Sequence, residues 1–352
     1  MYEKNEAANL IIEAGLKLVE CGLIARTWGN ISARISETQF MITPSGRSYD
    51  SLTPDDIVVV NLEDYSYEGE IKPSGEKDLH GEVYRNRPEV NFIIHTHQLY
   101  GTVYGSLGQD LSDLRCPATE NYPAVSDEDI KEILGKKIPC GEYAISATKK
   151  LALRMSEAVT DNPDCFGFFM KYHGVLCLGR DYEHAFLVSS LIEDITERKV
   201  EGRLRFVLEG KGNNEFVITE DIKNQFPGKT VMFISSPAIE AVSVKHEKLR
   251  PTIDDLAQIG GVTIRSIDAE DVLDGRLKSA MKKNNVAFIH GYGAIAVCDS
   301  VSDCEALGIV LHKNCMALLF EKVSGEPHYL GYFDAKYQRR VYVKKYSKLK
   351  NS

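Results

Sequence analysis

Two hydrophobic periods alternate along this chain of 352 residues, and that alternation constrains the fold more than any other feature. Segments with apolar residues at helical spacing, such as 5–21, are followed by short apolar runs that Pro, Gly, Ser and Asp separate. Because the runs are short and joined by tight turns, a regular parallel sheet is not expected. The sequence predicts a layered α/β protein with a mixed, largely antiparallel sheet flanked by helices.

The first part of the chain contains most of these segments. Gly22 ends the first helix in the usual way. Further helices are expected at 77–86, 148–159 and 182–198. Strands are expected at 31–35, 40–43, 57–62, 92–95, 166–170 and 175–178.

A Gly- and Asn-rich stretch at 209–214 is the clearest candidate linker. It divides the chain into expected domains of residues 1–208 and 215–352, and the length also suggests about two domains at ~150 residues each. The pattern of the second, smaller domain also predicts an α/β fold. Its strands are expected at 230–235, 262–267 and 286–289, and its helices at 268–283 and 303–320.

A weak internal sequence similarity links the two domains. His173-Gly174, an apolar strand and a helix from about residue 183 resemble His290-Gly291, the apolar run 294–297 and a helix through 304–306. Two α/β domains can share such a unit by accident, and a duplicated segment would also produce it. We favour duplication, because His-Gly precedes a strand in both places.

Charge and cysteine usage exclude several classes of protein. The 42 Lys and Arg against 51 Asp and Glu give a net charge of −9, which disfavours binding to nucleic acid or an anionic membrane. No apolar run approaches the ~18–20 residues that span a bilayer, and acidic residues interrupt the N-terminal segment where a secretory signal would need an apolar core. Eight cysteines without a CxxC pair indicate reduced thiols, so a cytoplasmic protein is expected.

The most informative stretch for chemistry is His95-Thr-His97 at the end of a predicted strand. Side chains two residues apart on a strand point to the same side, so both imidazoles can face one metal ion. A buried strand also accommodates histidines that are only hydrogen-bonded within the core, and the pair alone does not exclude that. His173, at a strand end before a glycine, is a third candidate ligand, although a lone turn histidine is usually structural.

Glu76 lies at the start of a predicted helix, after Ser74-Gly75. Such an acid commonly interacts with the helix dipole, but it can also serve as a base beside a metal. The helix N-terminus offers donors for a phosphate group. Two further turns, 27–32 and 43–46, carry similar donors, and each alone is an ordinary turn.

Taken together, six short motifs resemble the class II aldolase/adducin family. They occur in the family's order and spacing: Gly29-Asn-Ile-Ser32, Thr43-Pro-Ser-Gly46, Pro73-Ser-Gly-Glu76, His95-Thr-His97, Ile138-Pro-Cys140 and His173-Gly174. The resemblance covers about residues 5–198. Within the family, this part of the chain is similar to the sugar-phosphate aldolases.

The resemblance implies a role for each matched residue. His95, His97 and His173 fall on the ligands of a divalent metal, normally Zn²⁺, and Glu76 falls on the catalytic acid/base. The positions on the phosphate-binding turns are Gly29, Asn30, Ser45, Gly46, Ser74 and Gly75. It also implies a homo-oligomer with a small-molecule sugar phosphate as substrate, and a tetramer is favoured.

Two departures from the family pattern stand out. The aldolases have a tyrosine proton donor shortly after a Pro-Ala pair, and here Tyr122 is displaced by one residue from that place. The second domain has no HxH pair and resembles a degenerate second aldolase-like domain, with a structural or interface role.

The implied reaction is cleavage of a ketose phosphate, such as a ketose 1-phosphate, to dihydroxyacetone phosphate and an aldehyde through a metal-stabilised enediolate. Two alternatives stay open. A sugar-phosphate 4-epimerase or dehydratase of the same family would use the same histidines, and a non-catalytic adducin-like assembly module would need none of them. Desolvation would raise the pKa of Glu76 whereas a nearby cation would lower it, and sequence does not decide between them.

Overall fold

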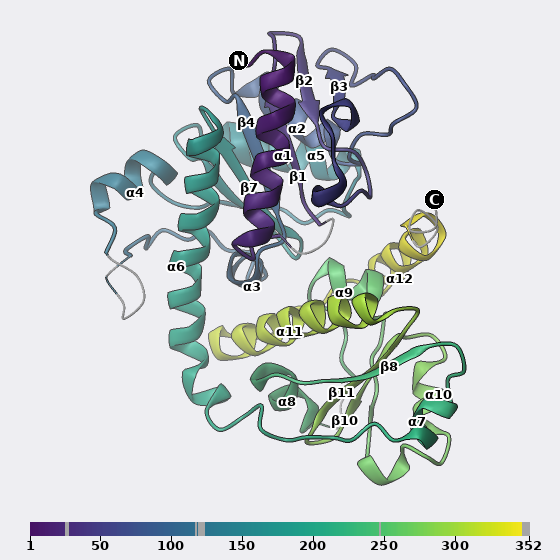
Figure 1. Cartoon of the computed structure of the whole chain (residues 1–352). Coiled ribbons are helices and arrows are strands. Elements are labelled where there is room, and N and C mark those ends of the chain that lie inside the picture. Colours follow the sequence, from purple (N-terminus) through teal and green to yellow (C-terminus); the bar gives the residue numbers. More distant parts are fainter. Residues whose placement is uncertain (25–27, 117, 119–123, 246–247, 347–352) are drawn as a thin grey trace. The chain divides into compact units, whose positions relative to one another are not determined.

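The chain forms two compact units, 1–199 and 200–352, in a computed structural model that describes residues 1–346 except 25–27, 117, 119–123 and 246–247 (Figure 1). The division falls inside helix α6, Tyr182–Leu208, ahead of the linker expected at 209–214. Among the described residues, no helix combines the length and apolar character that crossing a membrane requires.

Unit 1 is built around a seven-stranded sheet in the order β3-β2-β1-β4-β7-β6-β5. Every neighbouring pair is antiparallel except β5 and β6, so the predicted mixed, largely antiparallel α/β fold is confirmed. The strands are β1 Asn30–Arg34, β2 Gln39–Ile42, β3 Val58–Asn61, β4 Phe92–Thr96, β5 Cys140–Gly141, β6 Gly167–Met170 and β7 Gly174–Gly179.

Helices cover this sheet, with α1 on one face and α2 and α5 on the other (Figure 1). The α-helices before α6 are α1 Lys4–Glu20, α2 Lys77–Asn86, α3 Leu99–Gly105, α4 Asp127–Leu134 and α5 Lys149–Asp161. Short 3₁₀ turns occur at Tyr49–Ser51 and Pro54–Asp56.

Helix α1 shows why the apolar spacing forms a helix in this place. Ala7, Ile11, Ala14 and Leu18 follow each other at three or four residues and are fully buried in the core of unit 1. Gly15, a poor helix former, lies against the Tyr49 ring, where a Cβ would approach Cδ1 to 2.0 Å. The glycine therefore permits close packing that a larger residue would prevent.

Unit 2 contains a four-stranded sheet in the order β8-β11-β10-β9. Its strands are β8 Thr230–Ile234, β9 Ser266–Ile267, β10 Val286–Ile289 and β11 Gly293–Cys298. Its helices are α7 Glu220–Asn224, α8 Pro237–Ser243, α9 Asp254–Ile259, α10 Arg276–Met281, α11 Val301–Ser324 and α12 Tyr332–Val341, with a 3₁₀ turn at Ala269–Asp271 and a π turn at Tyr342–Tyr346.

Two expectations for unit 2 were wrong in extent. The helix expected at 268–283 is a 3₁₀ turn and the separate helix α10, because Gly275 has a left-handed φ of 91° and interrupts the segment. The strand expected at 262–267 forms only at its last two residues, where β9 pairs with β10.

Candidate metal centre

His95 lies at the middle of the sheet, on β4 between β1 and β7. Its side chain is fully buried, and its Nδ1–H donates to the Val175 carbonyl oxygen at 2.9 Å. Because a carbonyl can only accept, this bond fixes the tautomer and turns Nε2 toward the other histidines. Burial lowers the pKa of His95 to about 3, which keeps the imidazole neutral as a ligand must be.

His97 follows the last residue of β4, and His173 closes the turn between β6 and β7. Tyr172 takes a left-handed φ of 63° in that turn, and the His173 amide donates to the Met170 carbonyl at 2.9 Å. Gly174 then passes close to β4, since a Cβ there would lie 2.3 Å from the Thr96 carbonyl oxygen and 2.9 Å from Cε1 of His95. The turn therefore brings His173 against the β4 histidines only because residue 174 is glycine.

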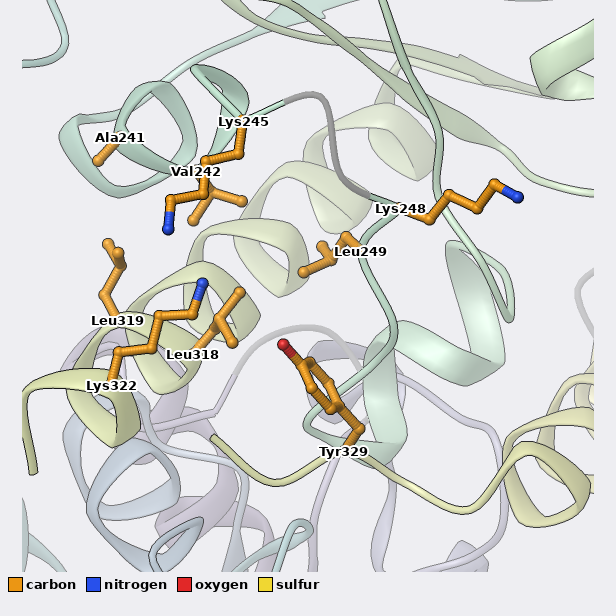
Figure 2. Close-up of a pocket in the computed structure, with 9 residues that line it drawn as sticks. All are labelled: Ala241, Val242, Lys245, Lys248, Leu249, Leu318, Leu319, Lys322 and Tyr329. Atoms are coloured by element: carbon orange, nitrogen blue, oxygen red, sulfur yellow. The ribbon is translucent and has the colours of Figure 1, made fainter. Parts of the chain in front are cut away.

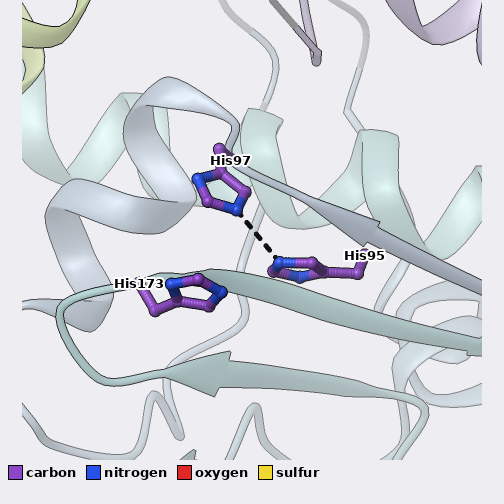
Figure 3. Close-up of side chains that lie close together, drawn as sticks. All are labelled: His95, His97 and His173. Atoms are coloured by element: carbon purple, nitrogen blue, oxygen red, sulfur yellow. Dashed lines mark hydrogen bonds between the residues drawn. The ribbon is translucent and has the colours of Figure 1, made fainter. Parts of the chain in front are cut away.

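The three imidazoles converge on one point (Figure 3). Nε2 of His95 and Nε2 of His97 are 3.1 Å apart, and one ring nitrogen from each of the three residues lies within 4.8 Å of the others. Among the described residues, this is the one cluster of three or more His, Cys, Asp or Glu side chains that could share a metal ion. Three imidazoles with an open fourth position suit a catalytic divalent metal such as zinc.

Glu76 is the N-cap residue of α2, but its side chain makes no capping bond and reaches the same point as the imidazoles. One carboxylate oxygen accepts from His173 Nε2 at 3.0 Å, while the other accepts from Asn30 Nδ2 at 2.9 Å and lies 3.4 Å from His95 Nε2. Burial alone raises the pKa of the carboxyl, but the facing His173 imidazole and the hydrogen bonds from His173 and Asn30 outweigh burial and hold this pKa well below its usual range. Glu76 is therefore a carboxylate in this structure.

Gly29 and Asn30 reach the centre through the pairing of β1 with β4. Asn30 lies opposite His95 in the register, so its amide can bond Glu76. Gly29 has a φ of 97°, and a Cβ there would lie 2.4 Å from the His95 carbonyl oxygen. A side chain at position 29 would push β1 away from β4, the strand that carries His95.

The other two predicted turns are joined to each other. The Ser45 amide donates to the Lys72 carbonyl and the Ser74 amide donates to the Thr43 carbonyl, both at 2.9 Å, around a bridge between residues 44 and 73. The Ser74 hydroxyl then accepts from the Glu76 amide at 3.2 Å. Ser45 is partly exposed and Gly46 and Gly75 are exposed, so the pair of turns presents backbone donors to solvent beside Glu76.

Some residues that support the centre gave no local signal in the sequence. The Glu193 carboxylate on α6 accepts from the Tyr100 and Gly101 amides, both at 2.9 Å, and so caps α3, which begins two residues after His97. Ser32 contacts His80 Nδ1 at 2.7 Å and the Tyr84 hydroxyl at 2.8 Å beneath α2. The partners are 48 or more residues apart, so only the fold reveals them. Tyr122, which lies one residue away from the place of the family's proton donor, is outside the described residues.

Unit 2 contains a separate small pocket between α8 and α11, with about 30 Å³ of free volume (Figure 2). Its lining is aliphatic apart from Lys245, Lys248, Lys322 and Tyr329. None of the described residues that line it carries an imidazole, thiol or carboxylate.

Comparison with known proteins agrees with this geometry. The family described as Class II Aldolase and Adducin N-terminal domain matches residues 9–200. A 5-deoxy-D-ribulose 1-phosphate aldolase of Bacillus thuringiensis serovar kurstaki is 34% identical over 184 residues, which are 52% of this chain and 79% of the relative. The chain belongs to the class II aldolase and adducin family.

Solved structures of similar proteins include two aldolases. An L-fuculose 1-phosphate aldolase has 26% identity and a TM-score of 0.49, covering 61% of this chain and 91% of its own. An L-fuculose-1-phosphate aldolase from Thermus thermophilus has 25% identity and a TM-score of 0.45, covering 56% and 94%. The family assignment itself rests on the match over 9–200 and on the Bacillus relative.

The family match confirms the predicted resemblance and the predicted enzyme class, a class II aldehyde-lyase of the sugar-phosphate type. It ends at residue 200, so it covers unit 1 and leaves unit 2 unmatched. The enzymes of this class use a divalent metal, and the cluster of His95, His97 and His173 is the candidate place for it.

Proposed function

We propose that this class II aldolase cleaves a ketose phosphate, such as a ketose 1-phosphate, to dihydroxyacetone phosphate and an aldehyde. The observation that carries the proposal is the contact of one carboxylate, Glu76, with the imidazoles of His95 and His173 at a buried three-histidine cluster. A scaffold protein has no need for a buried carboxylate that faces three potential metal ligands, which argues against the adducin-like assembly module.

His95, His97 and His173 would hold the metal, for which we propose Zn²⁺. The donor set fits this ion, because His95 is neutral and its ring is oriented by the Val175 carbonyl. Its Nε2 also lies 3.1 Å from Nε2 of His97, which is close to the spacing of adjacent ligand atoms around a tetrahedral ion. Once bound, such an ion acts as a Lewis acid and stabilises the negative charge that cleavage leaves on the donor fragment.

Glu76 would move the proton to and from the carbon at which the bond breaks. Its low pKa makes it a carboxylate, and therefore a proton acceptor, at neutral pH. Asn30 holds one carboxylate oxygen and leaves the other directed at His173, so the carboxylate has a fixed orientation before substrate binds. This orientation supports a role as acid/base rather than as a simple helix cap.

The turns with Gly29, Ser45, Gly46, Ser74 and Gly75 would bind the substrate phosphate. Backbone amides and hydroxyls at a helix N-terminus bind phosphate without a cationic side chain. Ser74 links this surface to Glu76 through its bond to the Glu76 amide. Phosphate binding would therefore place the reacting carbon close to the acid/base.

A retro-aldol screen tests the proposal. Zinc-loaded protein is incubated with a panel of ketose 1-phosphates, and dihydroxyacetone phosphate is measured with a coupled dehydrogenase. Release of dihydroxyacetone phosphate from at least one substrate is expected. An epimerised or dehydrated sugar phosphate without release would instead support the 4-epimerase or dehydratase, and binding of less than roughly a tenth of an equivalent of zinc would support the assembly module.

We also propose that the enzyme works in the cytoplasm as a homo-oligomer, with a tetramer as the expected form. All eight cysteines are free, which suits a reducing compartment. Closed symmetry is the common form of such assemblies, and a partner chain would supply the proton donor that the described residues of one chain do not identify. Light scattering combined with activity on dilution tests this, and a fully active monomer would contradict it.

A further inference from the structure

The sheet of unit 2 repeats four of the seven strands of the sheet of unit 1. In unit 1 the strands β4, β7, β6 and β5 lie side by side in this order across the sheet, and they form two antiparallel pairs and then a parallel pair. In unit 2 the strands β8, β11, β10 and β9 lie side by side in this order across the sheet, with the same succession of antiparallel and parallel pairs. The four strands also come in the same order along the chain in both units.

The register of the strands agrees as well. The central hairpin of unit 1 pairs Gly174 with Met170, and that of unit 2 pairs Gly293 with Ile289. On its other side in the sheet, the residue after each glycine pairs with the last residue of β4 or β8. These pairs are Thr96↔Val175 in unit 1 and Ile234↔Ala294 in unit 2. The parallel pairs also correspond, as Cys140↔Phe169 and Ser266↔Phe288.

The turns of the two hairpins have the same geometry. Each turn has three residues, 171–173 and 290–292, and the middle one is left-handed: φ is 63° at Tyr172 and 77° at Gly291. The amide of the third residue donates to the last residue of the preceding strand, from His173 at 2.9 Å and from Tyr292 at 3.0 Å. A shared strand–turn–helix motif alone would not require this agreement.

The helices after these strands complete the match. A seven-residue helix begins three residues after β4 and after β8, as α3 and α8. A long helix begins three residues after β7 and after β11, as α6 and α11. Both long helices are capped by the residue before them: the Asp181 carboxylate accepts from the His184 amide, and the Ser300 hydroxyl accepts from the Asp303 amide.

We propose that unit 2, from β8 to α11, is a second copy of the β4–α6 part of unit 1 that has lost its metal ligands but kept the backbone that places them. The register puts Phe233, Ser235 and Tyr292 at the positions of His95, His97 and His173. The register also corrects the match between His173-Gly174 and His290-Gly291 that the sequence suggested, because His290 corresponds to Lys171 and not to His173.

An aromatic contact has replaced the metal site. Phe216, from the segment before α7, lies 6.0 Å from the Phe233 ring and 5.8 Å from the Tyr292 ring, measured between centroids. Phe216 thus bridges two of the three former ligand positions, and the third, Ser235, donates its hydroxyl to the Tyr292 carbonyl at 3.2 Å. Apolar packing holds this end of the sheet where an ion would hold it in unit 1.

The proposal predicts that two histidines placed on this backbone will bind a metal together. Ser235 and Tyr292 are both exposed, so Ser235→His and Tyr292→His disturb the core little. The double variant S235H/Y292H should bind one additional equivalent of Zn²⁺ per chain, at least ~10-fold tighter than either single variant, since even the loss of an indirect supporting partner weakens metal binding by that factor.

Equilibrium dialysis with metal analysis measures the additional zinc in the double and single variants, and circular dichroism confirms that each is folded. A folded double variant that binds zinc no tighter than the single variants would overturn the proposal. So would a natural chain that binds two equivalents, one of which survives His95→Ala. The comparison of double with single variants does not depend on metal at His95, so it still decides this proposal if the proposed function fails.

Discussion

The strand ends of β4 and β7 in unit 1 and of β8 and β11 in unit 2 have matching pairings. Among the described residues, however, only the end in unit 1 carries a cluster of side chains that could share a metal ion. In unit 1 the end is closed by three imidazoles and a carboxylate, and in unit 2 by Phe216 against Phe233 and Tyr292. The backbone makes a metal site possible, and three side chains decide whether one exists.

A second difference lies in what precedes these strands. In unit 1, β1 and α2 supply Asn30 and Glu76 to the centre. In the part of unit 2 that the structure describes, the sheet ends at β8, with no strand in the place of β1. The proposed metal binding and the proposed acid/base chemistry therefore involve different parts of unit 1, and substitutions can separate them.

The largest expected effect comes from removing a ligand. His95→Ala or His173→Ala should lose the metal and abolish activity while the fold survives, because two imidazoles bind an ion weakly. Tyr292→Ala, at the position matching His173, should leave zinc content and activity unchanged. Metal analysis and the retro-aldol assay measure both, and a full equivalent of zinc in either histidine variant would refute the ligand assignment.

Glu76→Gln should retain the metal and lower turnover by at least ~100-fold, the scale expected for losing a general acid/base. Glutamine keeps the size and the contact with Asn30 but cannot accept the proton. The readouts are zinc content, turnover and exchange of the donor-carbon proton with solvent. Unchanged proton exchange would show that another residue moves this proton.

Gly174→Ala tests the close approach of the His173 turn to β4. A Cβ would lie 2.3 Å from the Thr96 carbonyl oxygen, so the turn must shift and zinc affinity should fall by roughly 10–100-fold, as when ligand orientation is lost. The matched control is Gly202→Ala in α6, where a Cβ meets no atom within 4 Å. Equal zinc affinity in the two variants would mean that the turn can relax without moving His173.

The buried His80 gives unit 1 a pH dependence that its replacement should remove. Burial lowers the pKa of His80 to about 4, whereas an exposed histidine has a pKa near ~6.5. Between these values only the unfolded chain binds the proton, so the free energy of unfolding should fall by up to about 3 kcal/mol as the pH falls from ~6.5 to ~4. Urea unfolding should show a shallower pH dependence in His80→Gln, and identical slopes would contradict this.

The smallest expected effect concerns the aromatic contact in unit 2. Phe216→Ala should lower the free energy of unfolding by about 1–2 kcal/mol, less than for a fully buried phenylalanine because this ring is only partly buried. Zinc content and turnover should not change. A loss of bound zinc would show that the centre depends on unit 2.

The sequence revealed the parts of this site that follow from local patterns. Alternation on a strand predicts that His95 and His97 face the same side, and the structure places them 3.1 Å apart at Nε2. Apolar spacing also predicts α1 and most of the strands.

Contacts between distant segments were beyond such patterns. The bond from Glu76 to His173 joins residues 97 positions apart, and the Asn30–His95 pairing depends on the register of two non-consecutive strands. Short helices such as α3 and α8 have too few turns for a clear apolar period, and Glu193 caps α3 from a helix far along the chain. These features are determined by tertiary packing rather than by local sequence.

A zinc titration of chelator-treated protein tests the central claim most directly. Retro-aldol activity is measured while Zn²⁺ is added in known fractions of an equivalent per chain. One catalytic metal centre, in unit 1, predicts activity that rises linearly and reaches its plateau at one equivalent. Activity that is independent of zinc, or that reaches its plateau only at two equivalents, would contradict it.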